Sequence, residues 1–419
     1  MNPQGLLELT AELLHVVLKL EAPADGIVSA FFKQNRALGS RERHTLAETT
    51  YSVLRQRLLF QNLAQSGHGP LERRLAILAW QGGDAYLRAA TTVDEQAWLA
   101  RVNAIDRSTL PDKLRHNMPD WLATPLRETL GDEFWPLVEA LNSAAPLDLR
   151  VNTFKAKRDD VQQQLAGAGI KSEITPFSPW GLRVQGKPAV NKLDLFTKGL
   201  IEVQDEGSQL LALLTDAKRG EMVVDFCAGA GGKTLALGAA MRSTGRLYAF
   251  DTSGHRLDAL KPRLARSGLS NVHPAQIAHE RDERIKRLAG KIDRVLVDAP
   301  CSGLGTLRRN PDLKWRQSPK SVQELQVKQL AILAGAARLL KPGGRLVYAT
   351  CSLLAAENEA VADGFNASHG ADFEVLPVLG VLESAKVERA GELVAGPNLR
   401  LWPHRHQTDG FFAAIWQRR

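Results

Sequence analysis

From residue 203 onward, short apolar segments alternate with helical segments, and this alternation restricts the chain to few folds. The apolar segments at 222–226, 246–250, 293–297 and 345–349 are typical of strands, and helical periodicity fills 209–214, 234–241, 256–266 and 322–340. Strands that alternate with helices in this way form parallel sheets. One further apolar strand is predicted at 411–416. We therefore predict a Rossmann-like α/β domain with a doubly wound, mostly parallel sheet.

The residues ahead of this domain have a different pattern. Helical periodicity runs from about residue 6 to residue 140, and the stretch that follows mixes short strands with one helix. A chain of 419 residues is long enough for two or three domains. We predict an all-helical domain at 1–142, a small α+β segment at 143–202 and the α/β domain at 203–419.

The charge of the chain admits a polyanionic partner without requiring one. The net charge is +8, and residues 305–345 carry nine Lys or Arg against two acids. Such a segment is as consistent with an ordinary solvated helix surface as with a nucleic-acid site. If it binds RNA, we expect Arg308, Arg309, Lys314 and Trp315 to hold phosphates and to stack a base.

The cysteine count argues against a disulfide framework and against a metal site. Only Cys227, Cys301 and Cys351 occur, widely spaced and odd in number, and no paired ligand pattern for zinc can be written. We expect free thiols in a reducing compartment. Because no apolar run approaches the ~20 residues of a membrane helix and the first residues lack the features of a secretory signal, we expect a cytoplasmic protein without membrane contact.

A glycine-rich turn follows the first strand of the predicted sheet. The sequence DFCAGAGGKT fails the P-loop pattern because Cys227 occupies its first glycine position, and it fails the dinucleotide pattern because Thr234 occupies its third. A nucleoside without pyrophosphate fits better, with Asp251 at the end of the next strand accepting the ribose hydroxyls. S-adenosylmethionine is such a ligand. The alternative is a tight turn and a helix-capping Asp with no ligand.

Two thiols follow two further strands of the sheet. Asp298 and Cys301 come after one strand and Cys351 comes after another. If the strands are neighbours, these side chains meet in one crevice beside the glycine turn. A single buried Cys more often only packs. Two at equivalent positions favour catalysis.

A thiol beside a methyl donor suits methylation of a pyrimidine at carbon 5. A thiolate that adds to carbon 6 makes carbon 5 nucleophilic enough to take a methyl group from a sulfonium. A nearby cation would favour the thiolate, and Lys233 is a candidate. Asp298 could bond the amino edge of cytosine, which uracil lacks.

These motifs resemble those of a known family. DFCAGAGGKT, AFD, DAPCSGLGTLRRNPDLKW, YATCS followed by Glu357 and Asn358, and DGFF are similar to the successive motifs of the Fmu/Sun family of RNA cytosine-5 methyltransferases. LRVN at 149–152 and VQDEGSQ at 203–209 match motifs ahead of that family's catalytic core. The first 140 residues are similar to the NusB-like RNA-binding domain of the small-subunit rRNA members. The resemblance implies a class I methyltransferase fold.

The resemblance also implies residue roles. Cys351 would be the nucleophile and Cys301 would promote release of the methylated base, although the related DNA enzymes use the thiol at the Cys301 position as nucleophile. Asp251 would hold the ribose, Asp298 would lie between cofactor and target base, and Lys233 would face the substrate. The methionine part of the cofactor would contact Cys227, Ala228, Gly229, Ala230, Gly231, Gly232 and Lys233.

Two positions depart from the family pattern. Ala230 stands where many members have Pro, which we expect to matter little because the glycines are intact. At Ala278 or His279 the family has an acidic residue that contacts the adenine. His279, Glu280, Asp282 or a backbone amide would have to replace that contact.

The resulting hypothesis is an S-adenosylmethionine-dependent RNA cytosine-5 methyltransferase, acting as a monomer on small-subunit (16S) rRNA. Its target base must be single-stranded or flipped out, because carbon 6 is inaccessible in a stacked duplex. The alternatives are the same chemistry on tRNA and a non-catalytic RNA-binding assembly factor.

Overall fold

The computed structural model describes all 419 residues, which divide into two compact units. The helical unit comprises Met1–Ala144 together with Thr306–Pro319, and the sheet unit comprises Ala145–Gly305 together with Lys320–Arg419. The chain therefore leaves the sheet unit once, after Gly305, and returns to it at Lys320. No helix has the length and the apolar character that a membrane crossing requires.

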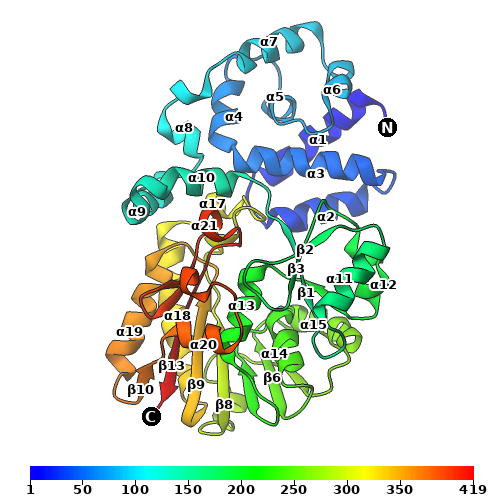
Figure 1. Cartoon of the computed structure of the whole chain (residues 1–419). Coiled ribbons are helices and arrows are strands. Elements are labelled where there is room, and N and C mark those ends of the chain that lie inside the picture. The colour runs from blue at the N-terminus through cyan, green and yellow to red at the C-terminus, as the bar shows by residue number, and fades with distance from the viewer. The chain divides into compact units, whose positions relative to one another are not determined.

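The helical unit is built entirely from helices (Figure 1). They are α1 Pro3–Val17, α2 Ala24–Gln34, α3 Ser40–Arg55, α4 Arg57–Ala64, α5 Leu71–Leu78, α6 Asp84–Ala90, α7 Val93–Asn103, α8 Asp112–His116, α9 Asp120–Leu130, α10 Phe134–Asn142 and α17 Leu313–Arg316. Side-chain caps fix several starts: Asn2 accepts a hydrogen bond from Gly5 N, and Thr92 and Glu95 form a capping box on α7. Leucine-rich faces of α1, α3, α4 and α5 form the core.

The segment Thr306–Pro319 packs within the helical unit, whereas the sequence predicted one continuous α/β domain over 203–419. Trp315 Nε1 donates to Leu54 O at 2.7 Å, and Lys314 Nζ donates to Arg55 O at 2.7 Å. The Asp312 carboxylate accepts a hydrogen bond from Ala24 N at 3.3 Å. These partners, all on α2 and α3, explain why the segment leaves the sheet unit.

A small antiparallel sheet begins the sheet unit. Its strands are β1 Leu147–Val151, β2 Ser172–Ile174, β3 Gly181–Val184 and β4 Ile201–Val203, in the order β2-β3-β1-β4. Helix α11 (Arg158–Gly167) connects β1 to β2, and the short α12 (Asp194–Thr197) precedes β4. Leu149, Val161, Leu165, Leu182 and Ile201 are buried together between helix and sheet. This sheet corresponds to the predicted α+β segment.

The large sheet has nine strands, in the order β11-β12-β13-β9-β8-β5-β6-β7, with β10 paired to β13. The strands are β5 Met222–Asp225, β6 Arg246–Asp251, β7 Val272–Gln276, β8 Ile292–Asp298, β9 Leu340–Thr350, β10 Phe373–Val375, β11 Val394–Ala395, β12 Asn398–Leu401 and β13 Phe411–Arg418. Strands β5 to β9 pair in parallel, and β10 to β13 extend the β9 edge in antiparallel pairs. The sequence predicted only the last of these antiparallel strands.

Helices cover both faces of the large sheet (Figure 1). They are α13 Glu206–Thr215, α14 Gly232–Ala240, α15 Gly254–Ser267 and α20 Val378–Ser384 on one face, and α16 Glu283–Lys286, α18 Pro319–Ala337 and α19 Glu359–His369 on the other. Alternate strand residues explain this arrangement: Val223 and Leu296 pack on the first set, and Val224 and Val295 pack on the second. The predicted fold class, a Rossmann-like α/β domain preceded by helices and a small α+β segment, is confirmed.

Candidate active site

The glycine turn connects β5 to α14 at the carboxyl end of the parallel strands. Gly229 and Gly231 have φ values of +54° and +85°, in the left-handed region that favours glycine. A Cβ on Gly231 would lie 2.1 Å from Leu260 Cδ1, so this position is closed to larger residues. A Cβ on Gly229 would meet no atom within 4 Å, so the backbone there borders open space. The turn can therefore be approached closely by a ligand.

A carboxylate from the next strand closes the turn. Asp251, the last residue of β6, accepts a hydrogen bond from Gly229 N at 2.8 Å through one oxygen and from Ser253 N at 2.7 Å through the other. Ala228 N donates to Phe250 O at 2.8 Å. These bonds place the turn, which the sequence assigned to the methionine part of a cofactor, beside the residue assigned to its ribose.

Arg263 supports the same turn through a hydrogen bond to its backbone. Its guanidinium donates to Ala230 O at 2.7 Å and to a carboxylate oxygen of Glu202 at 2.9 and 3.1 Å. Glu202 lies on β4 and also pairs with Arg266 of α15 at 2.5 Å. The small sheet thus supports the glycine turn through one buried carboxylate. Sequence reasoning missed Glu202 and Arg263, because neither follows a strand of the large sheet.

One buried carboxylate under the turn has an oxygen without a partner. Asp225, at the end of β5, accepts a hydrogen bond from Thr234 Oγ1 at 2.7 Å through Oδ2, while its Oδ1 is buried and unbonded. Burial raises the pKa of Asp225 to about 7, and the charge of Asp298 adds to the rise. A ligand cation at this oxygen would relieve that cost. The donor set and the open turn fit an amino-acid-bearing nucleoside.

Lys233, at the start of α14, and Asp298, at the end of β8, form an ion pair next to the glycine turn. Lys233 Nζ lies 2.7 Å from Asp298 Oδ2, and 11% of the lysine side chain and 30% of the aspartate side chain are exposed. Burial alone would lower the pKa of Lys233, but the charge of Asp298 and the hydrogen bond to it outweigh burial and raise the pKa. Lys233 is therefore a cation at neutral pH. The nearby Cys351 contributes to the same rise.

The two strand-end cysteines face each other. β8 and β9 are neighbouring parallel strands, with Asp298 opposite Ala349, and Cys301 Sγ lies 3.4 Å from Cys351 Sγ. The two strands are thus neighbours, which is the condition under which the sequence predicted that both thiols would share one crevice. All three cysteines, Cys227 included, are free thiols.

The surroundings of the thiols are electrostatically unequal. A hydrogen bond to Cys351, burial, and the charges of Cys351 and Glu357 all raise the pKa of Cys301. Burial and the charges of Asp225 and Asp298 raise the pKa of Cys227. Both thiols therefore hold their protons at neutral pH. In the contact between the two sulfurs, either thiol can be the hydrogen-bond donor.

Comparisons with known proteins show the family to which the chain belongs. Residues 212–417 match the family model described as 16S rRNA methyltransferase RsmB/F, and residues 118–191 match the ferredoxin-like domain of RsmF/B-like methyltransferases. The probable ribosomal RNA small subunit methyltransferase B of Synechocystis is 36% identical over 74% of this chain and 69% of the relative. The chain belongs to the RsmB/F methyltransferase family. The Fmu/Sun resemblance is thereby confirmed.

Other relatives of the RsmB/F family extend the comparison. The probable ribosomal RNA small subunit methyltransferase B of Bacillus subtilis is 34% identical, and the chain spans 65% of its length. Among solved structures, that of PH0851 covers 99% of both chains at 26% identity with a TM-score of 0.78. A methyltransferase homologue from Pyrococcus horikoshii is 30% identical, with a TM-score of 0.64 over 75% of this chain and all of that chain.

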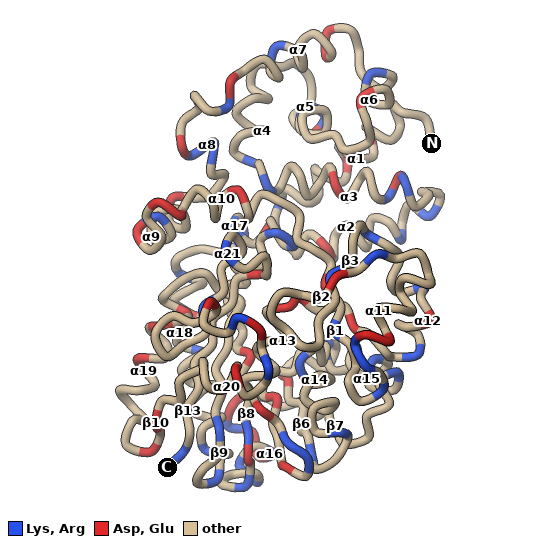
Figure 2. Tube along the Cα trace, in the orientation of Figure 1, with Lys and Arg blue, Asp and Glu red and all other residues tan.

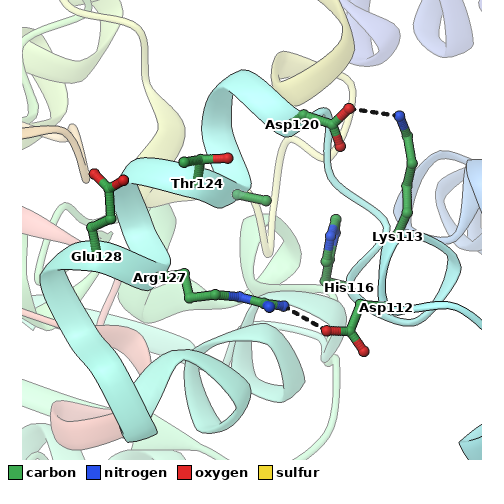
Figure 3. Close-up of a pocket in the computed structure, with 8 residues that line it drawn as sticks. Asp112, Lys113, His116, Asp120, Thr124, Arg127 and Glu128 are labelled. Carbon is green, nitrogen blue, oxygen red and sulfur yellow. Dashed lines mark hydrogen bonds and ion pairs between the residues drawn. The ribbon is translucent and has the colours of Figure 1, made fainter.

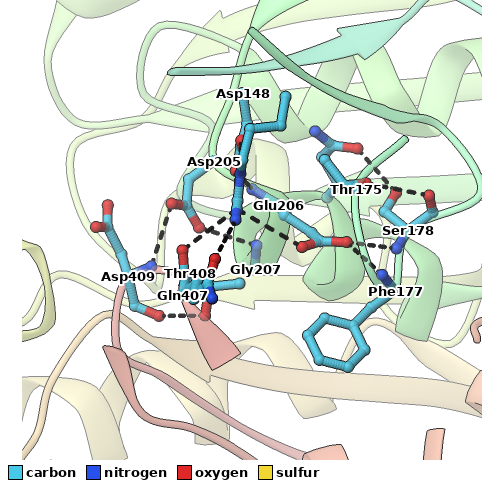
Figure 4. Close-up of polar contacts among 12 residues, drawn as sticks. Asp148, Thr175, Phe177, Ser178, Asp205, Glu206, Gly207, Gln407, Thr408 and Asp409 are labelled. Atoms are coloured by element: carbon cyan, nitrogen blue, oxygen red, sulfur yellow. Dashed lines mark hydrogen bonds and ion pairs between the residues drawn. The ribbon is translucent and has the colours of Figure 1, made fainter. Parts of the chain in front are cut away.

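Two RsmB/F family motifs outside the crevice are joined in the structure (Figure 4). Asp205, which caps α13, accepts a hydrogen bond from Asp409 N at 3.1 Å, directly before Gly410 of the DGFF motif. A Cβ on Gly305 would lie 2.1 Å from Gly410 O and 2.8 Å from Cys351 O. The VQDEGSQ and DGFF motifs therefore support the cysteine loops by close backbone packing.

The predicted phosphate-binding role of the basic segment is wrong for two of its four residues, Arg308 and Lys314. Lys314 and Arg308 are buried at 4% exposure. Trp315 is half-buried and donates its indole N–H to Leu54 O. Burial and the charge of Arg55 lower the pKa of Lys314 to about 7. Arg309 is half-buried. The charge count of the segment misled the prediction, because Arg308 and Lys314 are buried within the helical unit.

Basic residues also cluster on α15 in Figure 2. Arg263 and Arg266 of this cluster are engaged by Glu202. Arg256 and Lys261 are exposed. Only some of the basic residues of α15 are therefore available to a partner.

The stretch that lacks the RsmB/F family's acidic residue follows β7. Ile277 N donates to Asp251 O at 3.0 Å, so this stretch lies beside the predicted ribose site. Asp282 accepts hydrogen bonds from Ala278 N and Arg284 N, both at 2.9 Å. Among the candidate replacements, Asp282 is thus the carboxylate held next to Ala278.

The helical unit has a pocket of its own, lined by the residues drawn in Figure 3. Its charges are paired internally, Lys113 with Asp120 at 2.8 Å and Arg127 with Asp112 at 2.9 Å. His116 is buried and accepts a hydrogen bond from Met118 N, and burial lowers its pKa. This histidine is a neutral core residue, as expected for a lone His.

Proposed function

We propose that this chain transfers a methyl group from S-adenosylmethionine to carbon 5 of a cytosine in small-subunit rRNA. The observation that carries the proposal is the pair of thiols 3.4 Å apart, next to the Lys233–Asp298 ion pair. The names of the RsmB/F relatives support the choice of small-subunit rRNA.

The nucleophile in this proposal is Cys351. It interacts electrostatically with the Lys233 cation, and its sulfur lies 3.4 Å from the Cys301 sulfur. The thiolate adds to carbon 6 of the cytosine, forming an S–C bond and raising the electron density at carbon 5. Carbon 5 takes the methyl group of the sulfonium, which leaves as a neutral thioether. Carbon 5 then gives up its proton to a water molecule, the S–C bond breaks and Cys351 leaves as thiolate.

Cys301 supports the last step. Because it holds its proton, its S–H can bond to the departing Cys351 sulfur and stabilise the thiolate as the S–C bond breaks. The methylated base is then free to leave.

Asp298 supplies selectivity for cytosine. Its carboxylate, held by Lys233 and still 30% exposed, accepts a hydrogen bond from the amino group of cytosine. Uracil presents a carbonyl oxygen at that position, which a carboxylate repels. Lys233 therefore orients Asp298 and places a positive charge near Cys351.

The cofactor supplies a methyl group on a sulfonium. The glycine turn from Cys227 to Lys233 would border its methionine part, with the unpartnered Asp225 oxygen suited to the ammonium group. Asp251 would accept the ribose hydroxyls at the end of β6. Asp282, which accepts a hydrogen bond from Ala278 N, would replace the acidic residue that contacts the adenine.

The test is methyl transfer from labelled S-adenosylmethionine to total RNA from a strain that lacks the protein. The wild type is compared with Cys351→Ala and Cys301→Ala, and the RNA is separated into rRNA and tRNA. Label recovered as 5-methylcytosine in small-subunit rRNA, and lost with Cys351→Ala, is the expected result. Label in tRNA would overturn the substrate, and no label in either RNA would overturn the enzymatic role in favour of an assembly factor.

A further inference from the structure

Beneath the two cysteines, a single buried carboxylate connects both loops. Glu357 has no exposed surface, and its oxygens accept hydrogen bonds from Ser302 N at 2.8 Å, Ser302 Oγ at 2.5 Å and Ser352 Oγ at 2.5 Å. Ser302 directly follows Cys301, and Ser352 directly follows Cys351. One side chain therefore reaches the residue after each thiol.

The loops are also joined to each other and to α18. Ser302 Oγ and Ser352 Oγ lie 3.2 Å apart. Gln329 Nε2 of α18 donates to Glu357 at 3.1 Å and to Pro300 O at 3.0 Å, just before Cys301. The carboxylate thus has four donors and needs no counter-ion in its buried position.

Glu357 itself is fixed from its backbone side. Tyr348 OH donates to Glu357 O at 2.6 Å, and Tyr348 is buried within β9. The next residue, Asn358, donates to Ser352 O at 3.0 Å and accepts from Thr350 Oγ1 at 2.5 Å. The carboxylate is therefore rigidly placed, and it transmits this placement to both cysteine loops.

We propose that Glu357 is a positioning residue that sets the separation of the Cys301 and Cys351 sulfurs by clamping Ser302 and Ser352. The proposal rests on the proposed function for its catalytic meaning, because the two thiols must act on one base in succession. Its structural content, a fixed sulfur separation, does not depend on any substrate.

The loops remain connected when the clamp is removed. Gly305 N donates to Cys351 O at 2.8 Å, and Ala299 N donates to Ala349 O at 2.9 Å, so the backbone contact between them persists. Removing the carboxylate should therefore loosen the thiols without separating the strands. Because Glu357→Ala also leaves buried donors unpaired, two milder variants accompany it.

The experiment measures how fast Cys301 and Cys351 form a disulfide when the full-length protein is treated with diamide, a diazene that oxidises two thiols and is reduced to a hydrazine. The product is identified by peptide mass spectrometry, with Cys227 as an internal unpaired thiol. Methyl transfer to RNA and the affinity for S-adenosylmethionine are measured in parallel. The variants are Glu357→Ala, Glu357→Gln and the double variant Ser302→Ala/Ser352→Ala.

We expect Glu357→Ala to lower both the disulfide rate and kcat by about tenfold to a hundredfold, because small misplacements of reacting groups carry costs of this size. The cofactor affinity should not change. Glu357→Gln, which has the same shape and can bond both hydroxyls, should recover most of both rates, and the double Ser variant should fall between them. Asp363→Asn, which removes an exposed carboxylate from α19, is the matched control and should match wild type.

An unchanged disulfide rate in Glu357→Ala would overturn the clamp, even if methyl transfer were lost. A failure of Glu357→Gln to recover the disulfide rate in a folded protein would overturn it as well. A disulfide rate that falls in Glu357→Ala, while the wild type itself methylates no RNA, would instead support the clamp and contradict the proposed function.

Discussion

The two cysteine loops occupy equivalent positions and differ in charge. Each follows a parallel strand at its carboxyl end, yet Cys301 lies in the field of the buried Glu357 and Cys351 in the field of the Lys233 cation. The same fold position thus places one thiol near a buried carboxylate, where its pKa is raised, and the other near a cation. The difference teaches that the neighbours of a strand end, and not the strand end itself, assign the chemical role.

The largest effect should come from Cys351→Ala. Without its thiolate no adduct forms, so methyl transfer should fall by more than about 10⁴-fold, the scale seen when a nucleophile is removed. Filter binding should show that RNA affinity is retained. Methyl transfer at a tenth of the wild-type rate would refute the unequal roles of the two loops.

Cys301→Ala should damage turnover more than adduct formation. With the proton-bearing thiol gone, the S–C bond to Cys351 should break slowly, and the protein should accumulate as a covalent complex with RNA. The measurement is a denaturing gel of protein mixed with RNA and S-adenosylmethionine. If Cys301→Ala yields no such complex while Cys351→Ala does, the two assignments must be exchanged.

Lys233→Met should have the next largest effect. Losing the cation removes both the Asp298 partner and the favourable field at Cys351, and a single electrostatic group of this kind typically contributes about 10²-fold. Lys233→Arg keeps the charge and serves as the control. Steady-state kinetics should place the loss in kcat, and equal losses in both variants would point to shape instead of charge.

The smallest effect should come from Lys314, in the segment Thr306–Pro319 that follows the Cys301 loop. Lys314 has a folded pKa of about 7 and an ordinary value of 10.5, so between these values the unfolded chain binds more protons and stability rises with pH. Lys314→Met should flatten that rise, as followed by calorimetry at pH 7 and pH 9. The exposed Lys19→Met is the control, and a slope equal to wild type in Lys314→Met would contradict the burial of this charge.

The sequence predicted the large sheet and the meeting of the two thiols, because strand alternation and strand-end position are local patterns with a fixed geometric meaning. It failed for Arg308 and Lys314, since a charge count carries no information on whether a basic side chain is solvated or buried. It gave Glu357 no role, although the residue follows YATCS within a quoted motif. The four residues between Ser352 and Glu357 must fold back before that carboxylate can reach both serines, and no periodic pattern in the sequence indicates such a return.

The most direct test of the central claim is to identify which sulfur carries the base. The wild-type protein is incubated with S-adenosylmethionine and small-subunit rRNA containing 5-fluorocytidine, whose carbon-5 fluorine blocks the final elimination, and the trapped peptide is sequenced by mass spectrometry. The account predicts a methylated fluorocytidine on Cys351. The same nucleotide found on Cys301 would contradict it.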